Sequence, residues 1–259
     1  MSMLVEVVTT FNKDGFEQYG EQFLHTFKKH WHGDILLTIY AEGFPGDMQD
    51  GERIRWRSYE ESCPKGVEFK ARTHPDPPIV EANRYRYAVN KFSHKSFALA
   101  DAMRRTKADC LVLIDADIET YGNVTPEWVK LLLWHDGAHN EDHPTRQYCH
   151  IACLLRPWYH HTECGFVLYR VCDKTRDMVQ TIEDVYTSDY VFNLTQGWCD
   201  SCVFDYVRER FEAERDLITR DLSPEERPAN GLDVFSGSVL GTRMIHHKGP
   251  KKNGNNKLR

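Results

Sequence analysis

The sequence has no apolar run long enough to cross a membrane. Its longest apolar stretches, Cys110–Ile114 and 131–134, fall far short of the roughly 20 residues that a membrane-spanning helix requires. The first residues also lack the basic and apolar regions of a secretion signal. We therefore expect a protein without a membrane element that is located in the cytoplasm.

Charge of one sign is not in large excess, and repeats and low-complexity linkers are absent. The formal net charge is −6, with 33 Lys and Arg residues against 39 Asp and Glu residues. This balance excludes a protein that coats nucleic acid by overall positive charge, but it leaves room for a local basic groove. Because 41% of the 259 residues are hydrophobic, a disordered chain is also excluded, and we expect a single domain.

The eight cysteines show no clear disulfide framework. Several lie inside apolar, strand-like segments of a chain without an export signal, so we expect reduced and mostly buried thiols. Cys199-x-x-Cys202 could combine with Cys149-His150-x-x-Cys153 in a zinc site. The flanks of these motifs lack the turn residues of a zinc knuckle, and we favour a structural role for the thiols.

The sequence alternates between strand and helix patterns, which is typical of an α/β protein. A strand at 4–10, a helix at 13–30 and a strand at 34–40 predict a β-α-β unit of the kind that opens nucleotide-binding domains. Further strands are predicted at 110–114, 151–155, 165–170 and 242–245, and further helices at 84–107, 125–134, 175–188 and 200–211. Gly, Pro and charged residues predict loops at 43–51, 62–78 and 223–237.

Two acidic residues stand where the most apolar predicted strand ends. In Leu111-Val-Leu-Ile-Asp115-Ala-Asp117 the two acids are two positions apart, so their side chains point the same way in extended backbone. The carboxyl end of a central strand is where α/β sheets bind ligands. Two neighbouring carboxylates repel each other, and a divalent cation with a nucleotide phosphate is a common partner for such a pair.

The strand that ends in Asp115-x-Asp117, together with the N-terminal β-α-β unit, resembles the GT-A fold of nucleotide-sugar glycosyltransferases. The segment His246-x-x-Gly249-x-x-Lys252 is similar to the element with which glycogenin-like and lipopolysaccharide galactosyltransferase-like enzymes close their site. This resemblance implies one Rossmann-like GT-A domain over residues 1–259, a three-layer α/β sandwich around a central, mostly parallel sheet. Its parts would be a nucleotide-sugar-binding half (1–120), an acceptor-binding half (121–240) and a basic tail (241–259) that closes over the donor.

The resemblance also assigns roles to individual residues. It places Asp115 near the ribose and the metal. It makes Asp117 and His246 ligands of Mn²⁺ or Mg²⁺, and an imidazole ligand favours Mn²⁺. It brings Gly249 and Lys252 to the donor diphosphate.

The tail departs from the family at one point, because Asn253-Gly254 stand where a Pro-Trp pair often follows the lysine. His247 is an alternative to His246 as metal ligand. On the helix before the acids, the segment from Arg86 to Lys95 looks like a subset of bacterial and phage GT-A proteins. Related enzymes place a basic residue of this helix near the donor, so Arg86 and Lys95 are assigned to donor binding, with a solvated helix face as the alternative interpretation.

Two acids in the second half of the chain are candidates for the general base. Asp200 follows Trp198 and stands at the expected start of a helix, where an N-cap is the alternative interpretation. In GT-A enzymes an acid at this helix start faces the acceptor, and in an inverting reaction it would deprotonate the acceptor hydroxyl. Glu163, before the strand predicted at 165–170, is the second candidate.

The function that the resemblance implies is metal-dependent transfer of a sugar from a nucleotide sugar, with a UDP-sugar favoured, to a hydroxyl acceptor. The phage-like segment suggests a hydroxymethylated pyrimidine base in phage DNA as acceptor, on which Trp158 or Trp198 could stack. Such an enzyme would act in the host cytoplasm. A saccharide or a protein hydroxyl is the alternative acceptor, and no obligate protein partner is evident.

Two other classes of protein compete with this prediction. A phosphatase of the haloacid dehalogenase type also has a strand that ends in Asp-x-Asp. That family requires Thr or Val where this chain has Glu119, and it requires a second pair of acids that the sequence does not show. A protein that binds a nucleotide sugar without catalysis is the other alternative, but it would leave the acids and the histidine without a purpose.

Overall fold

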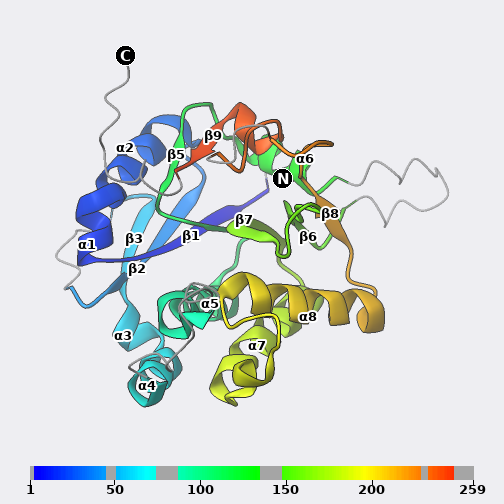
Figure 1. The fold of residues 1–259 in the computed structure, drawn as a ribbon. Coiled ribbons are helices and arrows are strands. Elements are labelled where there is room, and N and C mark those ends of the chain that lie inside the picture. Colours follow the sequence, from blue (N-terminus) through cyan, green and yellow to red (C-terminus); the bar gives the residue numbers. More distant parts are fainter. Residues whose placement is uncertain (1–2, 45–50, 74–86, 135–147, 229–232, 248–259) are drawn as a thin grey trace.

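The computed structural model describes residues 3–44, 51–73, 87–134, 148–228 and 233–247. They form an α/β sandwich of the Rossmann-like type around a sheet of seven strands (Figure 1). The strand order is β3-β2-β1-β4-β7-β6-β8, and β5 pairs with β9 in a separate two-stranded sheet. The large sheet is mostly parallel, because only β7 runs antiparallel to its neighbours β4 and β6.

Strands and helices alternate along most of the chain. The strands are β1 (Val5–Asn12), β2 (Leu36–Glu42), β3 (Ile54–Ser58), β4 (Cys110–Ile114), β5 (Ile118–Thr120), β6 (Ile151–Leu154), β7 (Glu163–Arg170), β8 (Thr219–Asp221) and β9 (Met244–His246). The α-helices are α1 (Lys13–Gly15), α2 (Glu21–His30), α3 (Tyr59–Ser62), α4 (Pro64–Thr73), α5 (Val89–Arg105), α6 (Pro126–Leu132), α7 (Asp173–Thr187) and α8 (Asp200–Arg215). Short helical turns lie at η1 (Phe16–Gly20), η4 (Tyr190–Asn193) and η5 (Leu240–Thr242).

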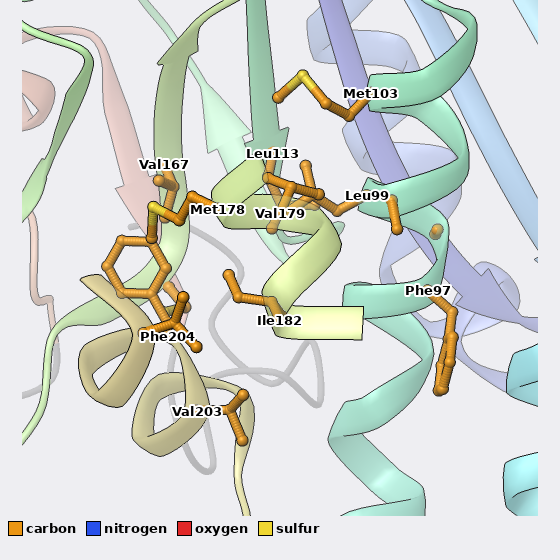
Figure 2. Close-up of a cluster of buried hydrophobic side chains, with 14 of the residues drawn as sticks. Phe97, Leu99, Met103, Leu113, Val167, Met178, Val179, Ile182, Val203 and Phe204 are labelled. Carbon is orange, nitrogen blue, oxygen red and sulfur yellow. The ribbon is translucent and has the colours of Figure 1, made fainter. Parts of the chain in front are cut away.

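Strand β4 shows why the sheet is covered on both faces. All five of its residues are buried, and successive side chains point to opposite faces. Leu111 and Leu113 enter an apolar cluster with α5, α7 and α8, whereas Val112 and Ile114 enter a second cluster with α2 and α6. Figure 2 shows the first cluster, in which side chains of the three helices meet next to Leu113 and Val167 of the sheet. The result is three layers, with helices on each side of the sheet.

The structure confirms most of the predicted elements within a few residues, but the loop predicted at 62–78 is wrong. This segment contains α4, because Pro64 is tolerated in the first turn of a helix and Gly66 packs where a side chain would collide with Tyr59 and Phe97. The helix predicted at 13–30 is divided into α1, the π-helical turn η1 and α2.

The sequence patterns also leave three strands without a prediction. Strands β3, β5 and β8 are only three to five residues long, and each of them includes polar or charged residues. They lack the apolar runs by which the longer strands are recognised. Each of them is held by pairing with a neighbouring strand, which is a tertiary interaction.

Two expectations from composition can be compared with the structure. Seven of the eight cysteines are buried, which confirms the prediction of mostly buried thiols, and the structure joins none of the eight in a disulfide. Within the described ranges, no helix combines the length and the apolar character that crossing a membrane would need.

The cluster in Figure 2 provides a test of the packing. Ile182 of α7 is 3% exposed, so Ile182→Ala removes buried methyl groups and leaves a cavity. We expect the free energy of unfolding to fall by about 2–5 kcal/mol in urea denaturation. Leu131→Ala on α6 is the control, because Leu131 is 61% exposed and its loss should cost about 0.5 kcal/mol or less. Equal losses in the two variants would contradict this description of the core.

Candidate functional site

A cleft of about 650 Å³ opens at the carboxyl ends of β1 and β4. This volume lies within the range of small-molecule sites, about 300–1,000 Å³. Its wall is built from separate elements, namely β1, the turn after β4, α5, β7 and the start of α8. The charged groups in that wall are Lys91, Lys95, Asp115, Asp117, Arg156, Glu163 and Asp200.

Asp115 and Asp117 lie in the turn between β4 and β5. The backbone N–H of Asp115 donates to the carbonyl of Gly165 at 2.8 Å, which continues the pairing of β4 with β7 by one residue. The Asp117 side chain is buried, and both acids line the cleft. The turn therefore presents two carboxylates at the position that the sequence pattern indicates.

His246 is brought to these acids by the small sheet. β5 and β9 pair antiparallel, with His246 opposite Ile118. The His246 Nε2 atom lies 3.0 Å from Asp117 Oδ1 and 3.6 Å from Asp115 Oδ2. His246 is only 1% exposed, and among the described residues neither ring nitrogen makes a hydrogen bond. The imidazole thus faces two carboxylates in a place that water barely reaches.

Glu163 approaches the same imidazole from the other side. Its Oε1 atom is 3.6 Å from His246 Nδ1, and its Oε2 atom accepts from the Arg156 guanidinium at 2.9 Å. The pairing of β6 with β7 shifts register at this point, so that Leu154 pairs with Glu163 and not with Phe166, the next β7 residue in step. Such a bulge redirects a side chain, and here it places a carboxylate beside His246.

Gly165 leaves the space that this arrangement needs. A Cβ atom at this position would lie 2.7 Å from His246 Nδ1 and 2.9 Å from Glu163 Oε1. Both distances are below any normal van der Waals contact of a carbon atom. A glycine is therefore required for the imidazole and the carboxylate to meet.

Lys95 of α5 lies between Asp115 and Asp200 and forms an ion pair with each of them. Its Nζ atom is 2.6 Å from Asp115 Oδ1 and 2.6 Å from Asp200 Oδ2, and it donates to the Cys164 carbonyl at 3.2 Å. Burial alone would lower the pKa of Lys95, but the carboxylates of Asp115 and Asp200 outweigh burial and raise it well above its ordinary value. Lys95 is thus a fixed positive charge between two acids.

Asp200 is the first residue of α8, and the N-cap position before it is Cys199. The helix has no side-chain cap, since Asp200 Oδ1 accepts only from the backbone N–H of the next residue, Ser201, at 2.9 Å. The helix-cap interpretation of Asp200 is therefore wrong. Its other oxygen faces Lys95 in the cleft.

Other candidate residues from the sequence do not lie beside Asp115, Asp117 and His246, or fall outside the described residues. The Nε2 atom of His247 lies 3.0 Å from Glu119 Oε2, whereas the contacts with Asp115 and Asp117 are made by His246. Trp198 does not line the cleft, because its ring packs edge-on against Tyr87 and Phe192. Trp158 lines a small pocket next to the cleft. Three predicted donor-binding residues lie outside the described part of the chain: Arg86, Gly249 and Lys252.

The sequence patterns do not single out Arg156 and Tyr19, and they include His94 in the segment from Arg86 to Lys95 without giving it a role; all three residues line the cleft. Arg156 has a positive φ of 51°, an uncommon backbone conformation for a residue other than glycine. Burial and then the nearby charges of Asp117 and Asp115 raise the pKa of Tyr19. Tyr19 and His94 fall within helical stretches, where a cleft-facing residue and a core residue have the same spacing, and Arg156 follows a buried strand without any motif.

The cleft contains carboxylates and an imidazole, which are groups that bind divalent cations in proteins. Among the described residues, Asp115, Glu163 and His246 form a group whose ligand atoms all lie within 4.8 Å of one another. Adjacent ligands of an octahedral ion with bonds of about 2.1 Å are about 3.0 Å apart. Asp117 is not part of this group, although its Oδ1 atom lies 3.0 Å from His246 Nε2.

The bridge through Lys95 gives a testable contribution to stability. In Lys95→Met the carboxylates of Asp115 and Asp200 lose their shared counter-charge, and we expect the free energy of unfolding to fall by about 3 kcal/mol. The folded-state pKa of Lys95 is raised above its ordinary value of 10.5, so the charged lysine stabilises the folded protein fully at any pH below 10.5. This stabilisation is lost only as the pH rises through the folded-state pKa. The deficit should therefore be equal at about pH 6 and pH 9.

Urea denaturation of Lys95→Met and of Lys91→Met measures this effect. Lys91 is an exposed residue on the same helix, so its loss should cost about 0.5 kcal/mol or less. A deficit of Lys95→Met that disappears at about pH 9 would show that the lysine is not held charged by its two acids.

No protein-family model matches this chain, and no curated protein sequence matches it. The function is therefore inferred from the distances and charges of the cleft and from the resemblance of its two motifs to the glycosyltransferases.

Proposed function

We propose that the protein is a metal-dependent glycosyltransferase of the GT-A type, which transfers a sugar from a nucleotide sugar, with a UDP-sugar favoured, to a hydroxyl acceptor. The observation that carries the proposal is the position of His246. The two motifs that resemble this family, Asp115-x-Asp117 and the segment that starts at His246, are far apart in the sequence, yet His246 Nε2 lies 3.0 Å from Asp117 Oδ1. Chance matches to two short motifs would not be expected to meet at the end of a central strand.

The donor set fits a hard divalent ion. Asp115 and His246 would hold Mn²⁺ or Mg²⁺ together with Asp117, which faces His246 Nε2, or with Glu163, whose Oε1 atom lies 3.6 Å from His246 Nδ1. When bound, the ion would neutralise the diphosphate of the donor and stabilise the charge that develops on it as the glycosidic bond breaks. The mixture of imidazole and carboxylate ligands favours Mn²⁺ over an ion that prefers oxygen ligands alone.

Basic residues and a glycine of the chain would bind the donor phosphates. Lys95 places an ammonium group within reach of Asp115 at the floor of the cleft, where a donor phosphate would be attracted. Gly249 and Lys252 would reach the diphosphate from the tail, by the resemblance of their motif. The cleft volume of about 650 Å³ suits a ligand of the size of a nucleotide sugar.

Asp200 is the better of the two candidates for the general base. Glu163 is 4% exposed and held by Arg156 and by the Gly165 N–H, so its carboxylate is committed to the floor of the site. Asp200 stands at the opposite wall, with one oxygen on Lys95 and the other on the backbone of α8. In an inverting reaction Asp200 would take the proton of an acceptor hydroxyl, and Lys95 would hold the carboxylate in place.

Aromatic residues at the rim of the cleft support the proposal of an acceptor with a planar or ring-shaped face. Trp158 and Tyr159 line a small pocket that shares Arg156, Tyr159 and Val234 with the cleft. Tyr159 is 46% exposed, and Arg156 and Arg227 lie over its ring. Aromatic side chains stack on nucleobases and on sugars alike. A hydroxymethylated pyrimidine in DNA and a saccharide are therefore both acceptors to assay.

The role of the acids predicts how a nucleotide binds. Because carboxylates alone repel a diphosphate, UDP should bind with Mn²⁺ and lose at least about tenfold in affinity when EDTA removes the ion. Isothermal titration calorimetry of wild type and of Asp117→Asn measures this, with Glu119→Gln as control, since Glu119 pairs with His247 and does not line the cleft. UDP binding that is equally tight in EDTA and in Asp117→Asn would reject the metal site.

The role of Asp200 gives a separate prediction for turnover. Asp200→Asn should keep the fold and the donor affinity yet slow sugar transfer by about a hundredfold or more, because an amide cannot accept the proton. Release of UDP from a panel of UDP-sugars, with single-stranded DNA and oligosaccharides as acceptors, measures the rate. Near-normal transfer by Asp200→Asn would exclude the base role and favour Glu163 or a retaining mechanism. Hydrolysis of p-nitrophenyl phosphate without sugar transfer would favour the phosphatase alternative.

A further inference from the structure

Two thiols meet at the start of α8. The Sγ atoms of Cys199 and Cys202 are 2.8 Å apart, and both residues are buried. Cys199 is the N-cap of the helix and Cys202 is three positions later, so their side chains lie on the same side of the first turn. The proposed sugar transfer uses neither thiol.

The distance between the sulfur atoms favours a covalent bond over a metal. A disulfide has an S–S length of about 2.05 Å, so the two sulfurs need to approach by only about 0.75 Å. Two thiolates on a tetrahedral zinc ion, with Zn–S bonds of about 2.3 Å, stand about 3.7 Å apart. The observed 2.8 Å is too short for the second arrangement.

The two thiols differ in their access to the cleft. Cys199 lines the cleft, whereas Cys202 is not among the lining residues and is 1% exposed. The Cys202 Sγ atom lies behind Cys199, at 3.6 Å from His161 Nε2 and 3.6 Å from the Gln196 carbonyl. A molecule that enters the cleft therefore meets Cys199 first, and Cys202 is positioned to react with Cys199 afterwards.

We propose that Cys199 and Cys202 are a redox-active dithiol that a small-molecule disulfide oxidises reversibly to an intramolecular disulfide. The Cys199 thiolate attacks one sulfur of the oxidant, the S–S bond of the oxidant breaks, and one thiol leaves with the proton that Cys199 has lost. Cys202 then attacks the sulfur of Cys199, and the second thiol leaves with the proton of Cys202. The protein loses two electrons and two protons, and the oxidant is reduced to two thiols.

The environment of the pair sets the rate of this reaction. Contact with the Cys202 sulfur and burial raise the pKa of the Cys199 thiol, so the first attack is slow at neutral pH. Ring closure is then fast, because the second thiol is held next to the first. The bond would enclose Asp200, the residue between the two cysteines that contacts Lys95 through Oδ2.

Oxidised glutathione is the probe, and peptide mass measures the product. Trypsin releases residues 177–208 as one peptide that contains Cys199 and Cys202 as its only cysteines. After folded full-length protein has been incubated with oxidised glutathione, free thiols are alkylated under denaturing conditions. We expect this peptide to lose two hydrogens and to escape alkylation, and dithiothreitol should restore the alkylated form.

Single substitutions test the order of the two steps. Cys202→Ser should stop the reaction after the first step and accumulate a glutathione adduct on Cys199. Cys199→Ser should give at least about tenfold less adduct, because Cys202 does not line the cleft. Cys63→Ser, a buried cysteine in another part of the core, should form the disulfide as the wild type does. Circular dichroism confirms that each variant is folded.

Two results would overturn the proposal. One is a wild-type peptide that stays fully alkylated at every ratio of oxidised to reduced glutathione, including after long incubation at pH values that ionise thiols. The other is zinc that copurifies in equimolar amount and is released when the two thiols are modified. Neither result depends on sugar transfer, so the test is independent of the proposed function.

Discussion

The crowding of carboxylates at one end of β4 is the constraint on which the site depends. Asp115, Asp117, Glu163 and Asp200 line one cleft, and their mutual repulsion would open it unless positive groups stand between them. Lys95 bonds two of these acids from α5, and Arg156 bonds a third from the segment after β6. The fold supplies these cations from three-dimensional neighbours, because no basic residue adjoins the acids in the sequence.

The large sheet and the small sheet each position a different part of the site. The large sheet ends β4 at the point where its order changes from parallel to antiparallel pairing, which leaves the following turn open to ligands. The small sheet adds His246 by pairing β9 with β5 (Figure 1). Gly165 and the register shift of β7 then make room for the imidazole. A chemistry that needs an imidazole and several carboxylates together thus depends on four separate backbone features.

The start of α8 combines two kinds of chemistry in one turn of helix. Asp200 contributes a carboxylate to the cleft, and the cysteines on either side of it are close enough to form a bond. Cys199 occupies the N-cap position of α8, but its side chain makes no capping hydrogen bond. An oxidised pair would restrain the backbone that carries Asp200 and would thereby connect the redox state of the thiols to the geometry of the cleft.

The sequence by itself determined the α/β class, the long strands and helices, the burial of most cysteines and the two acids at the end of β4. These features depend on apolar periodicity and on the polarity of neighbouring residues, which are properties of the local sequence. Tertiary structure alone decided the short strands β3, β5 and β8, the position of His246 beside Asp117 and of His247 beside Glu119, and the bridge from Lys95 to Asp115 and Asp200. The physical reason is that pairing between distant segments, not local pattern, sets which side chains face one another across the cleft.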